Sequence, residues 1–251
     1  MKKIKDYLLL IKLSLSIMVV FSSIMSFALT KGSENYVDFW RMILLLFAGG
    51  MLVTGSANAI NQVVEKDTDA QMKRTAKRPV ASGRMSVTEG WIFSIVTGAA
   101  GVFILGYFFN WLAAGLAAFS LFLYAFIYTP LKKVNSIAGL MGAVPGGLPC
   151  LIGWAAGDDQ LSTGGWILFA FQFFWQFPHF WSIGFLSYDQ YKHAGYKLLP
   201  EDDGQIDRRL GTQTLVYTCL LIPVIAIGFI MQLISIWGAI GLVLVSSYFI
   251  W

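Results

Sequence analysis

Residues 61–79 read NQVVEKDTDAQMKRTAKRP, and they follow directly on an apolar run of about twenty residues. Asn61, Glu65 and Asp69 are spaced four apart in this stretch. On a helix, residues with this spacing stack along one face. A column of carboxylate and amide oxygens suits a hard divalent cation such as Mg²⁺. The stretch therefore predicts a helical membrane protein in which these three residues form a metal site at the mouth of a span.

Two arginines, again four residues apart, follow the acidic residues. Arg74 and Arg78 belong to the same polar segment as Asp69. Guanidinium groups bind phosphate oxygens through paired, charge-assisted hydrogen bonds. Oxygen ligands beside two guanidiniums predict a site for a metal-bound diphosphate. The candidate catalytic residues are therefore Asn61, Glu65, Asp69, Arg74 and Arg78.

The rest of the composition places this stretch in a membrane. Hydrophobic residues make up 57% of the 251 residues and charged residues only 13%, with a mean hydropathy of +0.65. A soluble domain has roughly a quarter charged residues, and a bilayer span needs about 20 apolar residues. We expect an all-α, polytopic transmembrane bundle that forms a single domain over residues 1–251. Its eight spans are predicted at about 13–30, 41–61, 90–109, 111–129, 136–156, 164–185, 212–233 and 235–251.

Basic residues gather in alternate loops. Sixteen of the eighteen Lys and Arg residues lie near the N-terminus or in segments 62–89, 129–136 and 186–211. Loops enriched in Lys and Arg are the cytoplasmic ones, so we expect the N-terminus and these segments to be cytoplasmic. The same arrangement explains the sequence pI of about 9.0, and nucleic-acid binding is not indicated.

Segments 62–89 and 186–211 are both long and rich in charge, whereas ordinary connections between spans are short. They lie on the same predicted side of the membrane, and a closed bundle brings them over one cavity. We therefore expect them to be the active-site loops. A solvated anchor beside a span is the simpler explanation for one charged loop. The regular spacing from Asn61 to Asp69, with arginines behind it, argues against that explanation.

The first stretch fits the pattern N-x-x-x-[DE]-x-x-x-D-x-x-M-x-R-T-x-x-R-P. This pattern resembles the first signature of the UbiA family of intramembrane prenyltransferases. Residues 128–135, YTPLKKVN, are similar to a turn of that family, and the span with Pro145 and Pro149 is similar to one of its helices. The resemblance covers about residues 10–225.

A third set of segments resembles the heme-modifying branch of the family, the heme O synthases. Residues 175–181 read WQFPHFW, and YDQY at 188–191 and LLP at 198–200 follow. Two features depart from the family. Members of the family often have two adjacent acids where this chain has Asp189 and Gln190. The family also has nine transmembrane helices, whereas eight spans are predicted for this chain. Because the last apolar run ends at Trp251 without a polar tail, we expect the chain to be cut short within or just after a span.

The resemblance implies a reaction. The farnesyl group of farnesyl diphosphate passes to a vinyl group of heme B, and water adds to give heme O and diphosphate. Mg²⁺ is the implied cofactor, and heme B is a substrate. The implied metal ligands are Asn61, Glu65, Asp69 and Asp189. Besides the two arginines, the substrate-binding residues implied are Lys73, Lys77, Lys132, Lys133, His179, Asp189 and Tyr191.

His179 has two interpretations. A lone histidine in an apolar stretch is most often a structural, hydrogen-bonded residue. Here aromatic residues flank it near the end of a span, and an aromatic slot with one imidazole suits an iron porphyrin with an axial ligand. Both interpretations stay open on the sequence.

Two alternative functions also stay open. A UbiA-type enzyme that prenylates a quinone precursor or a chlorophyll-like ring has the same diphosphate chemistry. A heme carrier or transporter has intramembrane polar groups as well, but it does not need carboxylates beside paired arginines on one side. For the heme branch we expect a bacterial inner-membrane location. The implied partners are the lipid bilayer and heme A synthase or cytochrome oxidase assembly proteins.

Overall fold

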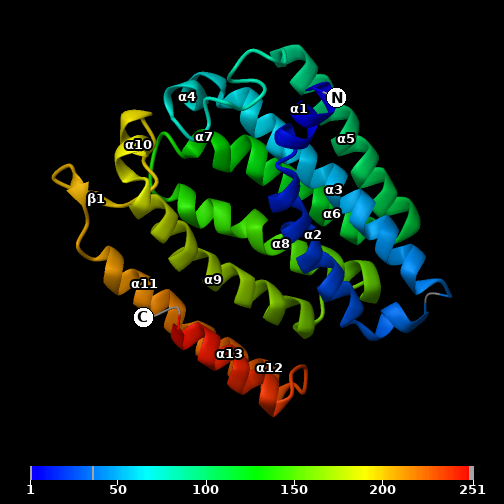
Figure 1. Cartoon of the computed structure of the whole chain (residues 1–251). Coiled ribbons are helices and arrows are strands. Elements are labelled where there is room, and N and C mark those ends of the chain that lie inside the picture. Colours follow the sequence, from blue (N-terminus) through cyan, green and yellow to red (C-terminus); the bar gives the residue numbers. More distant parts are fainter. Residues whose placement is uncertain (1, 36, 249–251) are drawn as a thin grey trace.

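The computed structural model describes residues 2–35 and 37–248, and these residues are almost entirely helical. A short antiparallel hairpin, β1 paired with β2, interrupts the helices. Figure 1 shows the helices running alongside one another in a bundle. The elements are α1 (Lys2–Leu10), α2 (Leu13–Ala28), the 3₁₀ helix η1 (Lys31–Asn35), α3 (Phe39–Val64), α4 (Lys66–Gln71), α5 (Val87–Phe108), α6 (Trp111–Phe122), the π-helix η2 (Leu123–Tyr128), α7 (Thr129–Leu131), α8 (Ala138–Asp158), α9 (Thr163–Leu186), α10 (Tyr188–His193), β1 (Glu201–Asp202), β2 (Gln205–Ile206), α11 (Leu210–Cys219), α12 (Leu221–Ile230) and α13 (Ile236–Tyr248).

Each of the eight predicted spans corresponds to a helix or to consecutive helices. Five of these helical segments are long and apolar enough to cross a membrane. The helices α1 and α2 together form a sixth candidate span, which is bent by 47°. The other two predicted spans, α9 with 24 residues and α13 with 13, are not among these candidates, so six of the eight predicted spans are supported within the described residues. The predicted end of the last span, residues 249–251, lies outside the described residues. The predicted fold class, an all-α multi-pass membrane protein, is confirmed.

Small residues bring α2 and α8 into close contact. A Cβ atom on Gly153 would lie 1.9 Å from the backbone oxygen of Ser23. The Ser23 hydroxyl donates to the Pro149 carbonyl at 2.8 Å, and the Ser26 hydroxyl donates to the Cys150 carbonyl at 2.6 Å. Glycine therefore allows close helix packing here, as expected for membrane helices.

The polar segments gather at one end of the bundle, where Figure 1 shows α4, α7 and α10 together. The Lys197 amide donates to the Lys132 carbonyl at 2.8 Å. Met72 of the first charged loop packs with Ala194 and Tyr196 of the second. The packing of Met72 on Ala194 and Tyr196 confirms the prediction that the two charged loops face each other.

Candidate active site

The column of oxygen ligands forms across the junction between α3 and α4. The Glu65 amide donates to the Asn61 carbonyl at 3.0 Å, and the Asp69 amide donates to the Glu65 carbonyl at 2.7 Å. The helical register therefore continues through the junction, and the three side chains stay on one side. All three are buried, with Asp69 fully enclosed.

Both carboxylates of this column are paired with cations. Lys132 Nζ lies 2.5 Å from Glu65 Oε1. Arg78 Nη1 donates to both oxygens of Asp69, at 2.8 Å to Oδ1 and 2.6 Å to Oδ2. Buried charged groups need partners of opposite charge, because an unpaired buried charge costs on the order of several kcal/mol. The geometry brings three of the four predicted metal ligands and two predicted phosphate-binding residues into one cluster.

A third cation was missed by the sequence analysis. Lys12 Nζ donates to Asn61 Oδ1 at 3.3 Å, and the Asn61 side-chain Nδ2 donates to the Thr129 hydroxyl at 3.4 Å. Lys12 was counted only among the basic residues that orient the N-terminus. The available signal was its position inside an apolar run, because an ionisable residue there indicates function by default.

Burial changes the acid–base properties of two groups in the cluster. It raises the pKa of Asp69, and the neighbouring guanidinium of Arg78 opposes that shift. Burial also raises the pKa of Tyr196, and the negative charge of Glu65 adds to the effect. Tyr196 also lies beside Lys132, whose Nζ is 5.6 Å from its ring centroid, and the sequence did not predict this residue at the site.

The other predicted phosphate-binding residues lie nearer to solvent. Arg74 is exposed, and its Nη2 donates to the Tyr191 hydroxyl at 2.7 Å, which links the two loops. Lys73, Lys77 and Lys133 are exposed around the cluster. These three lysines stay predictions.

Asp189 is exposed on α10 and is not gathered with the column. Within the described ranges, no three His, Cys, Asp or Glu side chains lie close enough to hold a metal ion. The buried oxygen donors of the column are the Glu65 and Asp69 carboxylates and the side-chain amide of Asn61. These hard oxygen donors fit Mg²⁺, which keeps several waters and takes only one or two protein carboxylates. Metal ligation by Asp189 stays a prediction.

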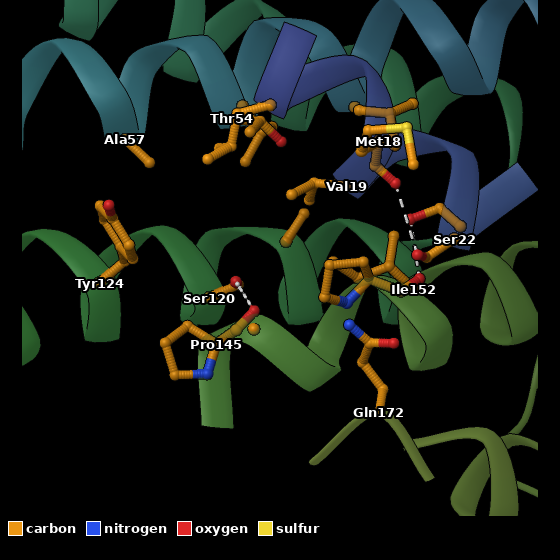
Figure 2. Close-up of a pocket in the computed structure, with 18 of the residues that line it drawn as sticks. Met18, Val19, Ser22, Thr54, Ala57, Ser120, Tyr124, Pro145, Ile152 and Gln172 are labelled. Atoms are coloured by element: carbon orange, nitrogen blue, oxygen red, sulfur yellow. Dashed lines mark hydrogen bonds between the residues drawn. The ribbon is translucent and has the colours of Figure 1, made fainter. Parts of the chain in front are cut away.

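A cavity of about 740 Å³ opens beside this cluster. Its lining comes from α2, α3, α5, α6, η2, α8 and α9, and Figure 2 shows Thr54 and Ala57 facing Tyr124 and Pro145 across it. The volume falls in the usual range of ligand pockets, about 300–1,000 Å³. Most of its lining side chains are apolar, which suits a hydrocarbon ligand.

Tyr128 connects the cavity to the charged cluster. It lines the cavity, and Lys132 Nζ lies 4.8 Å from its ring centroid. Tyr128 ends the π-helix η2, a local widening that often marks functional sites. Gly142 makes room for the ring, because a Cβ there would lie 2.6 Å from Tyr128 Cε2. The ion-pair cluster therefore adjoins the cavity at Tyr128.

His179 faces the same cavity from α9. Gln172, Trp175, Gln176 and His179 share one helix face, and all four line the cavity. The His179 ring stacks on Trp175, with centroids 5.1 Å apart and an interplanar angle of 14°. Of the flanking aromatic residues, Trp175 and Phe180 line the cavity, whereas Phe177 and Trp181 pack against Tyr217. The aromatic slot for a porphyrin and heme ligation by His179 stay predictions.

An oxygen-ligand and cation cluster at the mouth of an apolar intramembrane cavity defines a class of protein. It suits a membrane enzyme that holds a charged head group at the surface and an apolar tail among its helices. Residues 19–251 match the UbiA prenyltransferase family, and the chain belongs to that family.

Several known proteins are similar to this chain. It is 44% identical to "Protoheme IX farnesyltransferase" of Flavobacterium johnsoniae over 217 residues, which cover 86% of this chain and 71% of the relative. It is 41% identical to the protein of the same name from Cytophaga hutchinsonii over 232 residues, 92% of this chain and 79% of the relative. A solved UbiA homolog from Archaeoglobus fulgidus, bound to DMAPP and Mg²⁺, superimposes with a TM-score of 0.71. That match covers 98% of this chain and 83% of the homolog at 16% identity, which shows the shared fold.

Proposed function

We propose that this chain is a Mg²⁺-dependent protoheme IX farnesyltransferase that converts heme B to heme O. The observation that carries the proposal is the join between the buried ion-pair cluster and the apolar cavity at Tyr128. Identity above 40% to relatives of that name supports the choice of acceptor. The whole chain is proposed to act as one domain.

The ion-pair cluster is proposed to bind the diphosphate. Mg²⁺, when bound at Asn61, Glu65 and Asp69, supplies positive charge to the departing diphosphate. Arg78 and Lys132 contact two of these ligands in the structure, so their cationic groups lie within reach of a diphosphate at the same place. Arg74 of the first charged loop, with Tyr191 of the second, is proposed to close the site together with the exposed lysines. Pre-positioned charges of this kind stabilise a leaving group without reorganisation during the reaction.

The farnesyl chain is proposed to lie in the apolar cavity. As the bond between farnesyl C1 and the diphosphate oxygen breaks, an allylic cation forms at the mouth of the cavity. The rings of Tyr124 and Tyr128 line this region and can stabilise a cation through their faces. The apolar lining keeps water from the cation before the acceptor arrives.

The acceptor is proposed to be a vinyl group of heme B. Its terminal carbon attacks farnesyl C1, a carbon–carbon bond forms, and positive charge moves to the vinyl carbon attached to the porphyrin. Water adds to that carbon and loses a proton, which leaves the hydroxyl of heme O. His179 and Trp175 are proposed to hold the porphyrin on the α9 side of the cavity.

A bacterial plasma membrane is the proposed location, with the N-terminus and both charged loops in the cytoplasm. Heme A synthase or cytochrome oxidase assembly proteins are proposed partners, because heme O needs a consumer. The runner-up function is prenylation of a quinone-precursor ring. Membranes containing the chain, supplied with Mg²⁺, farnesyl diphosphate and either heme B or 4-hydroxybenzoate, distinguish the two by their products. A prenylated benzoate without heme O would overturn the proposal.

A further inference from the structure

The first span is broken in a specific place. The helix α1 ends at Leu10, α2 begins at Leu13, and the two meet at 47°. Between them, Lys12 has φ 49° and ψ 59°, in the left-handed region. Residues other than glycine rarely adopt this conformation, and it persists only where the surroundings hold it. The break therefore needs an explanation in its contacts.

Two side chains of α3 hold the break in place. Gln62 Nε2 donates to the Leu9 and Leu10 carbonyls, at 3.0 and 2.9 Å. Asn58 Nδ2 donates to the Ile11 carbonyl at 3.2 Å. These amides satisfy carbonyls that an interrupted helix leaves without their usual donors, which membrane helices require. Asn58 and Gln62 flank Asn61 on α3, so the segment that carries a metal ligand also fixes the break.

The break directs the Lys12 side chain into the active site. Lys12 is half-buried, and its Nζ contacts Asn61 Oδ1 at 3.3 Å. The surrounding charges that act on this ammonium group are those of Arg78, Lys132, Glu65 and Asp69. Lys12 thus belongs to the same group as Lys132 and Arg78, each of which contacts one member of the ligand column.

We propose that Lys12 is a third diphosphate-binding cation and that the break in the first span serves to deliver it. This inference rests on the proposed function, because it takes the diphosphate as substrate. The charges of Arg78 and Lys132 balance those of Asp69 and Glu65. Lys12 adds one positive charge to these four groups. An ammonium group acts on phosphate as a compact point charge. The first span therefore contributes to substrate binding as well as to the wall of the cavity.

The test is binding of Mg²⁺ with inorganic pyrophosphate to the purified full chain, measured by calorimetry. The variant Lys12→Gln keeps a donor for Asn61 but removes the charge. We expect it to weaken pyrophosphate binding and to raise KM for farnesyl diphosphate by about tenfold or more, with an unchanged KM for heme B. Lys5→Gln is the matched control, since Lys5 is an exposed cation on α1, and it should bind like the parent. Lys12→Arg should restore most of the binding.

A second measurement uses the unaltered protein and does not depend on how a variant folds. Reductive methylation of lysines, read by mass spectrometry, should show that Mg²⁺ with pyrophosphate protects Lys12 and leaves Lys5 reactive. Equal labelling of Lys12 with and without pyrophosphate would overturn the inference, as would parent-like pyrophosphate binding by a folded Lys12→Gln protein. If the parent itself did not bind pyrophosphate, the proposed function would fail along with the inference.

Discussion

Arg78 holds Asp69 through both carboxylate oxygens, at 2.8 and 2.6 Å, and no part of Asp69 is exposed. Arg78 is therefore tied to a buried carboxylate as well as available to a substrate phosphate. Arg74, four residues earlier, is exposed, and its side chain donates to the Tyr191 hydroxyl of the second charged loop. The two arginines have the same predicted role but different surroundings, and their variants should differ.

Arg78→Ala should lower both catalytic efficiency and stability, because it removes a phosphate contact and leaves Asp69 buried without its cation. Arg74→Ala should affect substrate binding alone. Loss of one charge-assisted contact costs about 1.5–3 kcal/mol, so kcat/KM for farnesyl diphosphate should fall roughly 10- to 100-fold for each. Steady-state kinetics and thermal melting in detergent separate the two effects. A collapse of heme affinity with intact diphosphate affinity would mean that the two substrate sites had been exchanged.

Glu65→Gln and Asp69→Asn should abolish turnover while the protein remains in the membrane, since each keeps the shape of the side chain and removes a charge. EDTA should stop turnover of the parent. Asp189→Asn is the informative comparison, because Asp189 is exposed and apart from the column. Weaker Mg²⁺-dependent diphosphate binding in that variant would support its predicted metal contact. EDTA-insensitive turnover, or nearly normal activity of both column variants, would contradict the metal assignment.

His179→Ala should change the absorbance spectrum of bound heme or raise the heme concentration needed for turnover, without altering diphosphate affinity. The reason is the position of His179 in the cavity, stacked on Trp175. A spectral titration with heme B and a parallel pyrophosphate titration provide the two readouts. An unchanged spectrum with unchanged heme dependence would assign His179 a structural role.

Gly153→Ala should destabilise the protein, because the new Cβ would lie 1.9 Å from the Ser23 carbonyl oxygen. Forcing α2 and α8 apart should cost about 1–3 kcal/mol, seen as a lower melting temperature. Gly115→Ala is the matched control on α6, since nothing lies within 4 Å of a Cβ there. Equal melting temperatures for the two variants would contradict the described packing of α2 against α8.

The sequence predicted the features that depend on local pattern. Apolar runs gave the positions of the spans, and the four-residue spacing gave the column from Asn61 to Asp69, which the backbone hydrogen bonds through the α3–α4 junction support. The meeting of the two charged loops followed from charge placement.

Features that depend on individual side-chain contacts between spans were not predictable. Residues 7–30 contain no Pro or Gly to indicate a break, and the break depends on amides of Asn58 and Gln62 from another span. The position of Lys12 in the site follows from that break. The π-helix η2 has no signal of its own in an aromatic, apolar stretch.

The most direct test of the central claim follows both products of one reaction. Purified protein in lipid is given heme B, Mg²⁺ and farnesyl diphosphate labelled at C1, in isotope-labelled water. The account predicts one labelled farnesyl group and one oxygen from water in each heme product, with equal release of diphosphate, and no release from the Asp69→Asn protein. Diphosphate release without farnesylated heme, or a farnesylated product that is not a heme, would contradict it.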